Sequence, residues 1–469
     1  MRTKVRNKMR KNKNKYYTVA VGKDTAQASA ITGSPNMVVG LNATRYPGDE
    51  FSNREISLNS FNDPRFSYPP SEDLLHGSMA RAGYNGSHST GENLNGEYVL
   101  SRNAFREMFL QKIRDEAGSK PVVISTYSST KVSDDFINMG FERTGPKSEL
   151  FYKYKVKTDP YNLAESLDIP VGEGSVVYNM EEAVRLFPKL KDKYGSVFVS
   201  SENGSAGESA LQVTDLGELV NFPDNPPFVM TGWVNKLASP TSMVLIGKEN
   251  SIYLGLADQL IEGVKYGGTI YPSVVDQRLQ NQIMDSTLRI SDVMRKDGYR
   301  GIANMDWIIS EERPDEALFT EINPRRNGSS GIWLGNLNRY LPEDHPSIYD
   351  LEIIASVENK DWPSNMTDLS KITDNRSHFW GMKLVKAKGK GMIVEETDSN
   401  YSENSIFNGI NGHSRRSIVG TLPSGTLLPG YRKAHRIGRV IAVAPDRDTV
   451  IKELEEGTKE ANRSYEIIT

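Results

Sequence analysis

Three residues whose side-chain oxygens could bind a metal lie in two short segments joined by a polar turn, within residues 298–330. Side chains alternate between the faces of a strand, so a hairpin centred near Arg313–Pro314 sets Asp306 across from Glu321, with Asn323 two residues further on. Two carboxylates and an amide oxygen are hard ligands suited to Mg²⁺ that bridges nucleotide phosphates. An amphipathic hairpin with a solvated acidic face has the same pattern, and the residues alone leave both interpretations open.

The same alternation assigns the neighbours of these ligands. It predicts that Trp307 points away from Asp306, and that Phe319 shares the face of Glu321. Arg325 follows Asn323 by two residues. A guanidinium at that place could neutralise a phosphoryl group through two parallel hydrogen bonds.

A second candidate is the loop Gly204, Ser205, Ala206, Gly207, which lies between two apolar runs. Small residues let backbone N–H groups approach an anion, so the loop is a candidate phosphate cradle. Its spacing matches neither the Walker P-loop nor the dinucleotide-binding fingerprint, so alone it is weak evidence.

Composition narrows the class of protein. The 469 residues carry 57 Lys and Arg against 60 Asp and Glu, which predicts two or three soluble domains and no general polyanion partner. The absence of cysteine excludes disulfides, thiolate metal sites and cysteine nucleophiles, and favours a cytoplasmic protein. The first fifteen residues hold eight Lys or Arg, interpreted as a disordered tail rather than a nucleic-acid or membrane arm. No segment is long and apolar enough to span a bilayer.

Apolar periodicity then predicts the elements that position these residues. Strands at 16–22, 36–42 and 121–129 with a helix over 103–118 indicate an α/β layer with a parallel sheet, and 43–98 is predicted to be a long irregular loop. A helix follows the capping-box pattern of Asn179 and Glu182, and a strand covers 196–201. The runs at 228–235, 242–247 and 251–259 are predicted to form one antiparallel series. A helix over 277–298 precedes the hairpin, and a strand followed by a helix covers 439–457.

Several of these segments, in this order, resemble the ATP-grasp ligases. FTEINPR and GYRGIANMDW resemble the two metal strands of that family, which implies that Asp306, Glu321 and Asn323 bind Mg²⁺ (or Mn²⁺) and that Arg325 is catalytic. Lys157 stands where the family has its first ATP-contacting lysine, and the resemblance gives it both a catalytic and an ATP-binding role.

The resemblance extends to the phosphate loop and to the adenine hinge. SVFVSSENGSAGESA resembles the flexible phosphate loop, and FVMTGWVN lies where family members contact adenine, which implies ATP contacts from Thr231, Gly232, Trp233 and Val234. The chain departs from the family at two places. Ser200 stands where a second lysine is usual, and Thr231 and Gly232 stand where the hinge usually has a glutamate.

The resemblance implies an α/β ATP-grasp fold with a preceding α/β domain. The expected parts are the tail at 1–15, the preceding domain at 16–150, a small subdomain at 151–230, a large subdomain with the Mg-ATP site at 231–345, and a C-terminal part at 346–469 that completes the large subdomain and the acceptor side.

The expected activity is ATP-dependent ligation of an amino-acid or other carboxylate to an amine or an acyl-carrier-protein thiol. The layout resembles pheganomycin-type peptide ligases and the butirosin-type ligase that loads glutamate onto a carrier protein, which implies antibiotic or other secondary-metabolite biosynthesis. No membrane or nucleic-acid partner is expected, and a homodimer is compatible with the family. A biotin-carboxylase-like enzyme that uses bicarbonate and a non-catalytic nucleotide-binding module stay open as alternatives.

Residues of the C-terminal part are candidates for the acceptor side. A carboxylate or phosphopantetheine could be bound by arginines, and two histidines could act as bases; ordinary salt bridges and solvated loop histidines are the competing interpretation. These residues are Arg415, Arg416, Arg432, Arg436, Arg439, His413 and His435.

Overall fold

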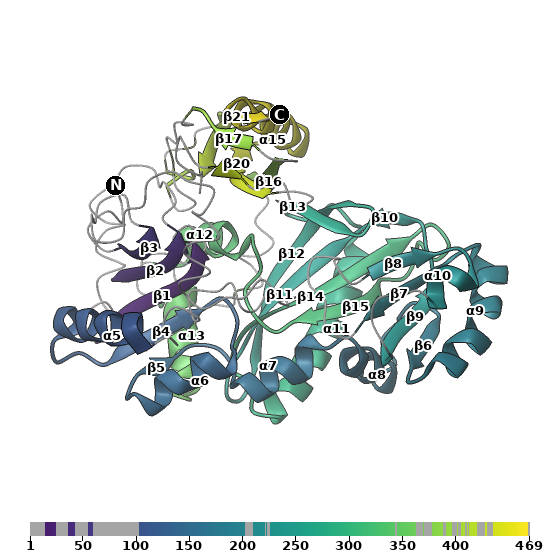
Figure 1. Cartoon of the computed structure of the whole chain (residues 1–469), viewed down its shortest axis with the longest axis horizontal. Helices are drawn as coiled ribbons and strands as arrows, with labels where there is room; N and C mark the ends of the chain where they lie inside the picture. The colour runs from purple at the N-terminus through teal and green to yellow at the C-terminus, as the bar shows by residue number, and fades with distance from the viewer. Residues whose placement is uncertain are drawn as a thin grey trace. The chain divides into compact units, whose positions relative to one another are not determined.

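The computed structural model divides the chain into two compact units, Met1–Gly145 with Gly328–Thr469, and Pro146–Asn327 (Figure 1). The structure describes residues 15–24, 36–42, 55–59, 103–201, 210–220, 222, 226–342, 345–362, 369, 378–387, 391–395, 401, 405–408, 410, 412–419, 427–428 and 435–467. No helix in these ranges is long and apolar enough to cross a membrane. The basic tail before Lys15, the loop 204–207 and Arg432 lie outside the described residues.

The first unit opens with the predicted α/β layer. Its strands are all parallel, in the order β3-β2-β1-β4-β5. The elements are β1 (Tyr17–Asp24), β2 (Met37–Asn42), β3 (Glu55–Asn59), β4 (Val122–Thr126), β5 (Glu142–Arg143), α5 (Asn103–Ala117) and α6 (Lys131–Asn138). Val19, Ile124 and Ile113 of α5 share one core. Strand β3 falls within 43–98, so the prediction of an uninterrupted irregular loop is wrong there, because the short run EISLN pairs with β2.

The second part of this unit is an antiparallel sheet with a helix. The strands β16 (Phe379–Ala387), β20 (His435–Ala444) and β18 (Arg415–Val419) pair in this order, and α15 (Arg447–Arg463) packs against them. The predicted strand followed by a helix is therefore confirmed. The remaining elements are α12 (Ser330–Tyr340), α13 (Ile348–Ser356), β17 (Gly391–Ile393), β19 (Leu427–Leu428) and β21 (Tyr465–Ile467).

The second unit contains a small antiparallel sheet in the order β6-β9-β7-β8. Its strands are β6 (Gly174–Val177), β9 (Phe228–Gly232), β7 (Val197–Ser201) and β8 (Ala210–Val213), with α9 (Met180–Tyr194) and α10 (Leu216–Val220). At the start of α9, Asn179 accepts the N–H of Glu182 as predicted, but the Glu182 carboxylate accepts the N–H of Tyr178 instead.

Strand β9 corrects one sequence prediction. It was expected in one antiparallel series with 242–247 and 251–259, but it pairs with β6 and β7. Phe228 and Met230 are fully buried in the core of the small sheet, together with Val199. An alternating apolar run predicts a buried strand but does not predict which strand it pairs with. The strand itself was therefore predicted correctly, and only the sheet to which it belongs was wrong.

The larger sheet of the second unit has the order β10-β14-β11-β12-β13, with β15 also paired to β14. Its strands are β10 (Lys236–Ala238), β11 (Pro240–Ile246), β12 (Ser251–Glu262), β13 (Lys265–Tyr271), β14 (Gly301–Ser310) and β15 (Leu318–Asn323). Helix α11 (Gln277–Lys296) buries Leu279, Ile283, Ile290 and Met294 in the core shared with β14. Two shorter helices, α7 (Ser148–Lys155) and α8 (Thr158–Ser166), complete the unit.

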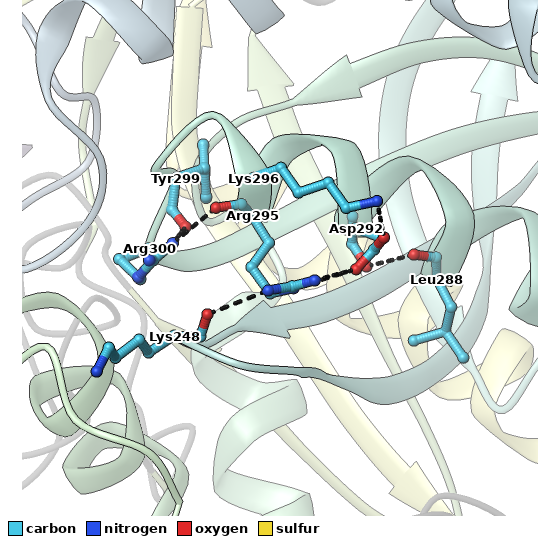
Figure 2. Close-up of polar contacts among 8 residues, drawn as sticks. Lys248, Leu288, Asp292, Arg295, Lys296, Tyr299 and Arg300 are labelled. Atoms are coloured by element: carbon cyan, nitrogen blue, oxygen red, sulfur yellow. Dashed lines mark hydrogen bonds and ion pairs between the residues drawn. The ribbon is translucent and has the colours of Figure 1, made fainter.

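Polar contacts at the end of α11 hold the start of β14 in place (Figure 2). The Arg300 guanidinium donates to the carbonyl oxygen of Arg295, in the last turn of the helix, and to that of Tyr299, just before the strand. Arg295 in turn donates to the carbonyl of Lys248 in the turn between β11 and β12. The last turn of α11 is thus tied both to the sheet and to the chain that enters β14.

Candidate active site

The β14–β15 hairpin brings the three predicted metal ligands together. Asp306 is the cross-strand partner of Glu321, as predicted. The Asn323 amide nitrogen lies 2.9 Å from Asp306 Oδ2 and 3.3 Å from Glu321 Oε1, and it donates to both. The three side chains form a compact, partly buried cluster on one face of the hairpin.

A β-bulge lies beside this cluster and corrects the predicted face of Phe319. The register shifts between Asp306 and Trp307, so that Trp307 pairs with Phe319 and Thr320 is the extra residue. The Thr320 hydroxyl donates to the Asp306 carbonyl at 2.9 Å. Phe319 packs edge-on against Trp307 in the core, with ring centroids 5.4 Å apart. Strict alternation put Phe319 on the face of Glu321 because a bulge inverts the alternation without a reliable sequence signal.

This packing carries a stability prediction. Phe319→Ala is expected to lower the free energy of unfolding of the second unit by about 3–5 kcal/mol, because a buried aromatic ring leaves a cavity against Trp307. Thermal unfolding monitored by Trp fluorescence measures the loss. The matched control is Leu211→Ala, an exposed apolar residue of β8, which should shift the midpoint little. Equal midpoints for the two variants would contradict the assigned face.

Lys157 reaches the cluster from the start of α8. Its ammonium nitrogen donates to the Ser200 hydroxyl of β7 at 2.6 Å and lies 3.5 Å from Glu321 Oε2. The Lys157 side chain is 11% exposed, so little solvent separates the two charges. The structure therefore brings together the predicted ATP-contacting lysine, the serine at the second-lysine position and a predicted metal ligand.

The electrostatics of the cluster favour a cation. Burial, and then the neighbouring Glu321 carboxylate, raise the pKa of Asp306 to about 7. Against the opposing effect of burial, Lys157, Asp306 and Asn323 hold the pKa of Glu321 below its usual range. Two adjacent carboxylates resist joint ionisation unless positive charge lies near them.

The donor set fits a hard divalent cation. Among the residues that the structure describes, Asp306 Oδ1 is buried and has no hydrogen-bond partner, so it stays available as an acceptor. A half-turn of the Asn323 amide would replace its donating nitrogen with the oxygen that Mg²⁺ prefers. Within the described ranges no group of three or more His, Cys, Asp or Glu side chains could hold a metal, so a site here depends on the amide.

Arg325 follows the cluster as the chain leaves β15. Its backbone N–H donates to the Asn323 carbonyl at 2.7 Å, and its guanidinium donates to the Arg326 carbonyl at 3.0 Å. The Arg325 charge is close enough to help lower the pKa of Glu321. The predicted catalytic arginine thus lies beside the predicted metal ligands.

Asn304 is a residue that the sequence interpretation did not assign to the site. It is fully buried in β14, and its amide nitrogen donates to the Arg325 carbonyl at 2.7 Å. Its amide oxygen accepts from the Asn327 side chain at 3.1 Å. A polar amide between Ala303 and Met305 in a buried strand was the available signal, because a buried amide needs partners.

The four predicted hinge residues lie at the end of β9 and just after it. The N–H of Gly232 donates to the Glu173 carbonyl at 2.9 Å, and that of Trp233 to the Ser196 carbonyl at 3.0 Å. Both donors are therefore engaged within the protein, and an adenine contact would have to use other groups of Thr231–Val234. Gly232 has a packing role of its own, since an added Cβ would meet the Tyr194 ring at 2.1 Å.

The C-terminal arginines that the structure describes belong to the other unit. Arg416 forms ion pairs with Glu453, at 2.8 Å, and with Glu456 and Glu460 of α15. For Arg416 these pairs favour an ordinary salt bridge over binding of an acceptor. Arg415 lies over the Tyr401 ring. Arg439 is buried and donates to the Gly328 carbonyl at 3.4 Å. His413 is exposed, and the side chains of Arg436 and His435 lie outside the description.

Solved structures share this fold. The biotin carboxylase domain of 2-oxoglutarate carboxylase from Hydrogenobacter thermophilus, solved with MgADP, ADP and bicarbonate, matches with a TM-score of 0.60 and 14% identity, over 97% of this chain and 90% of that one. Biotin carboxylase from Campylobacter jejuni matches with a TM-score of 0.61 and 14% identity, over 97% and 92%. N5-carboxyaminoimidazole ribonucleotide synthetase from Thermus thermophilus matches with a TM-score of 0.51 and 12% identity, over 96% and 98%.

These likenesses define the class of fold. The chain has the α/β ATP-grasp fold, as the sequence resemblance implied. No family model and no curated protein matches the sequence. At 12–14% identity the likeness concerns the fold, so the activity has to be argued from the residues of this chain.

Proposed function

We propose that the protein is an ATP-dependent, ADP-forming ligase that activates a carboxylate as an acyl phosphate and transfers the acyl group to an amine or a carrier-protein thiol. The observation that supports this most is the meeting of Lys157, from a distant segment of the sequence, with Asp306, Glu321 and Asn323 of the hairpin. A lysine beside a carboxylate pair and an amide is suited to Mg-ATP.

The reaction transfers the γ-phosphoryl group first. An oxygen of the substrate carboxylate bonds to the γ-phosphorus, the bond from that phosphorus to the β–γ bridging oxygen breaks, and ADP leaves. The amine or thiol then bonds to the acyl carbon and loses its proton, and inorganic phosphate leaves. No covalent bond to the protein is needed, which agrees with a chain that has no cysteine.

The residues of the cluster have separate roles in this proposal. Asp306, Glu321 and Asn323 would hold Mg²⁺, which when bound supplies positive charge to the phosphate oxygens. Lys157 leaves Glu321 to neutralise phosphate oxygens, and the Ser200 hydroxyl orients its ammonium group. Arg325 stabilises the charge of the transferring phosphoryl group. The loop Gly204–Gly207 is proposed to cover the phosphates and exclude water.

The substrate within this class is proposed from the resemblance. An amino acid such as glutamate as the acid, with a peptide amine or acyl carrier protein as the acceptor, would place the enzyme in antibiotic or other secondary-metabolite biosynthesis. The second candidate is bicarbonate activation, favoured by the match to a carboxylase domain solved with MgADP and bicarbonate.

A phosphate-release screen tests the proposal. The full chain with ATP and Mg²⁺ is given each amino acid with a carrier protein or peptide acceptor, and separately bicarbonate with biotin or an amine. ADP formation that needs an amino acid and an acceptor supports the ligase. ADP formation that needs bicarbonate supports the second candidate. Binding of ATP without turnover under every mixture would overturn both and favour a nucleotide-binding module.

A further inference from the structure

Asn304 connects the buried sheet to the segment that carries Arg325. Asn304 is fully buried on the face of β14 that also carries Asp306, whereas its chain neighbours Ala303 and Met305 lie in the core on the other face. An amide in such a place is costly unless both of its ends are bonded. Here both are, since the nitrogen donates to the Arg325 carbonyl and the oxygen accepts from Asn327.

The segment that Asn304 binds has left the sheet. Asn323 is the last residue of β15, and Pro324 has no N–H with which to continue a ladder. Beyond Pro324, the N–H of Arg325 donates back to the carbonyl of Asn323, two residues earlier in the chain. Asn304 is the cross-strand partner of Asn323, so its side chain reaches just past the strand end.

We propose that Asn304 is a positioning residue, which holds the backbone of Arg325 so that the guanidinium meets the transferring phosphoryl group. The inference rests on the proposed function for the role of Arg325, and on the described hydrogen bonds for the role of Asn304. A displacement of a catalytic group by about 1 Å can cost about 100-fold in rate, so one buried bond is enough to matter.

The first test is kinetic. Asn304→Ala should lower kcat by about 10- to 100-fold and change the KM for ATP little, because Lys157 and the metal ligands stay in place. In an Arg325→Ala background the same substitution should have almost no further effect on kcat, because the two residues act as one unit. Multiplicative losses in that cycle would show a merely structural role and overturn the inference.

A matched control separates positioning from loss of stability. Thr287→Val removes another buried bond of this unit, the 2.7 Å contact with Ser242, and should lower the thermal midpoint without lowering kcat. Asn327→Ala leaves the bond to Arg325 intact and should lower kcat less than Asn304→Ala does. Equal losses of kcat in Asn304→Ala and Thr287→Val would contradict the positioning role.

A second readout does not depend on activity. Amide hydrogen exchange in a peptide that covers 322–330 should rise at least several-fold in Asn304→Ala, because the segment loses the two hydrogen bonds that the Asn304 side chain makes to it. Unchanged exchange there would overturn the inference, whether or not the protein turns over ATP. A different result would be no ADP formation by the wild-type chain together with faster exchange in the variant. That result would overturn the proposed function, but the structural role of Asn304 in holding the Arg325 segment would stand.

Discussion

Glu321→Gln is expected to lower ADP formation about 1000-fold or more and to leave the fold intact. Glutamine has the shape of glutamate, but it removes the charge that would hold the cation and that faces Lys157 at 3.5 Å. Stabilisation by a bound metal is worth several kcal/mol, and about 1.4 kcal/mol corresponds to tenfold in rate. Asp306→Asn should have an effect of the same order, because its carboxylate is the cross-strand partner.

The measurement combines steady-state ADP formation with titration of Mn²⁺ in the presence of ADP, and circular dichroism reports on folding. Glu316→Gln is the matched control, since that carboxylate lies in the turn of the same hairpin and pairs with Arg313. The control should keep wild-type turnover. Near-normal turnover in both Asp306→Asn and Glu321→Gln would remove the metal assignment.

Lys157→Met is expected to move two affinities in opposite directions. The KM for ATP should rise about tenfold or more, because a charge-assisted hydrogen bond to phosphate contributes about 1.5–3 kcal/mol. The affinity for Mn²⁺ without nucleotide should rise, because Lys157 no longer neutralises Glu321. The physical reason is that the ammonium group and the metal compete for one carboxylate until a nucleotide draws the lysine away.

Steady-state ADP formation at varied ATP gives the KM, and calorimetric titration of the full chain with Mn²⁺ gives the affinity for the free metal. Lys155→Met is the matched control. Lys155 stands two residues before Lys157 in the chain, and its ammonium group lies over the ring of Phe151 on α7. It should leave both affinities unchanged. A lower KM for ATP, or weaker binding of free Mn²⁺ in Lys157→Met, would mean that the lysine has another role.

Local patterns were enough to predict much of the fold. The helices α5, α9 and α11 and the strands β1, β4, β7 and β14 lie where apolar periodicity predicted them. The Asp306–Glu321 register was also predictable, because the two strands follow one another in the chain and a hairpin centred on the polar turn at Arg313–Pro314 pairs these positions. These features depend on residues near one another in the chain.

The errors arose where a distant partner or a backbone irregularity decides. Strand β9 joined the small sheet, since its sequence only required burial. The bulge at Thr320 moved Phe319 into the core, and the sequence of β15 has no signal that predicts such a shift. The hydrogen bond from Asn304 to Arg325 was not predictable, because the sequence indicates that a buried amide needs a partner but not which residue that partner is.

By itself the sequence determined the types of groups available: a carboxylate pair, an amide, an arginine two residues later, and no cysteine. Only the tertiary structure decided that Lys157, 164 residues before Glu321 in the numbering, lies beside that pair and is held by Ser200. The physical reason is that ligand chemistry belongs to single side chains, whereas charge pairing depends on distances that packing of α8, β7 and β15 sets.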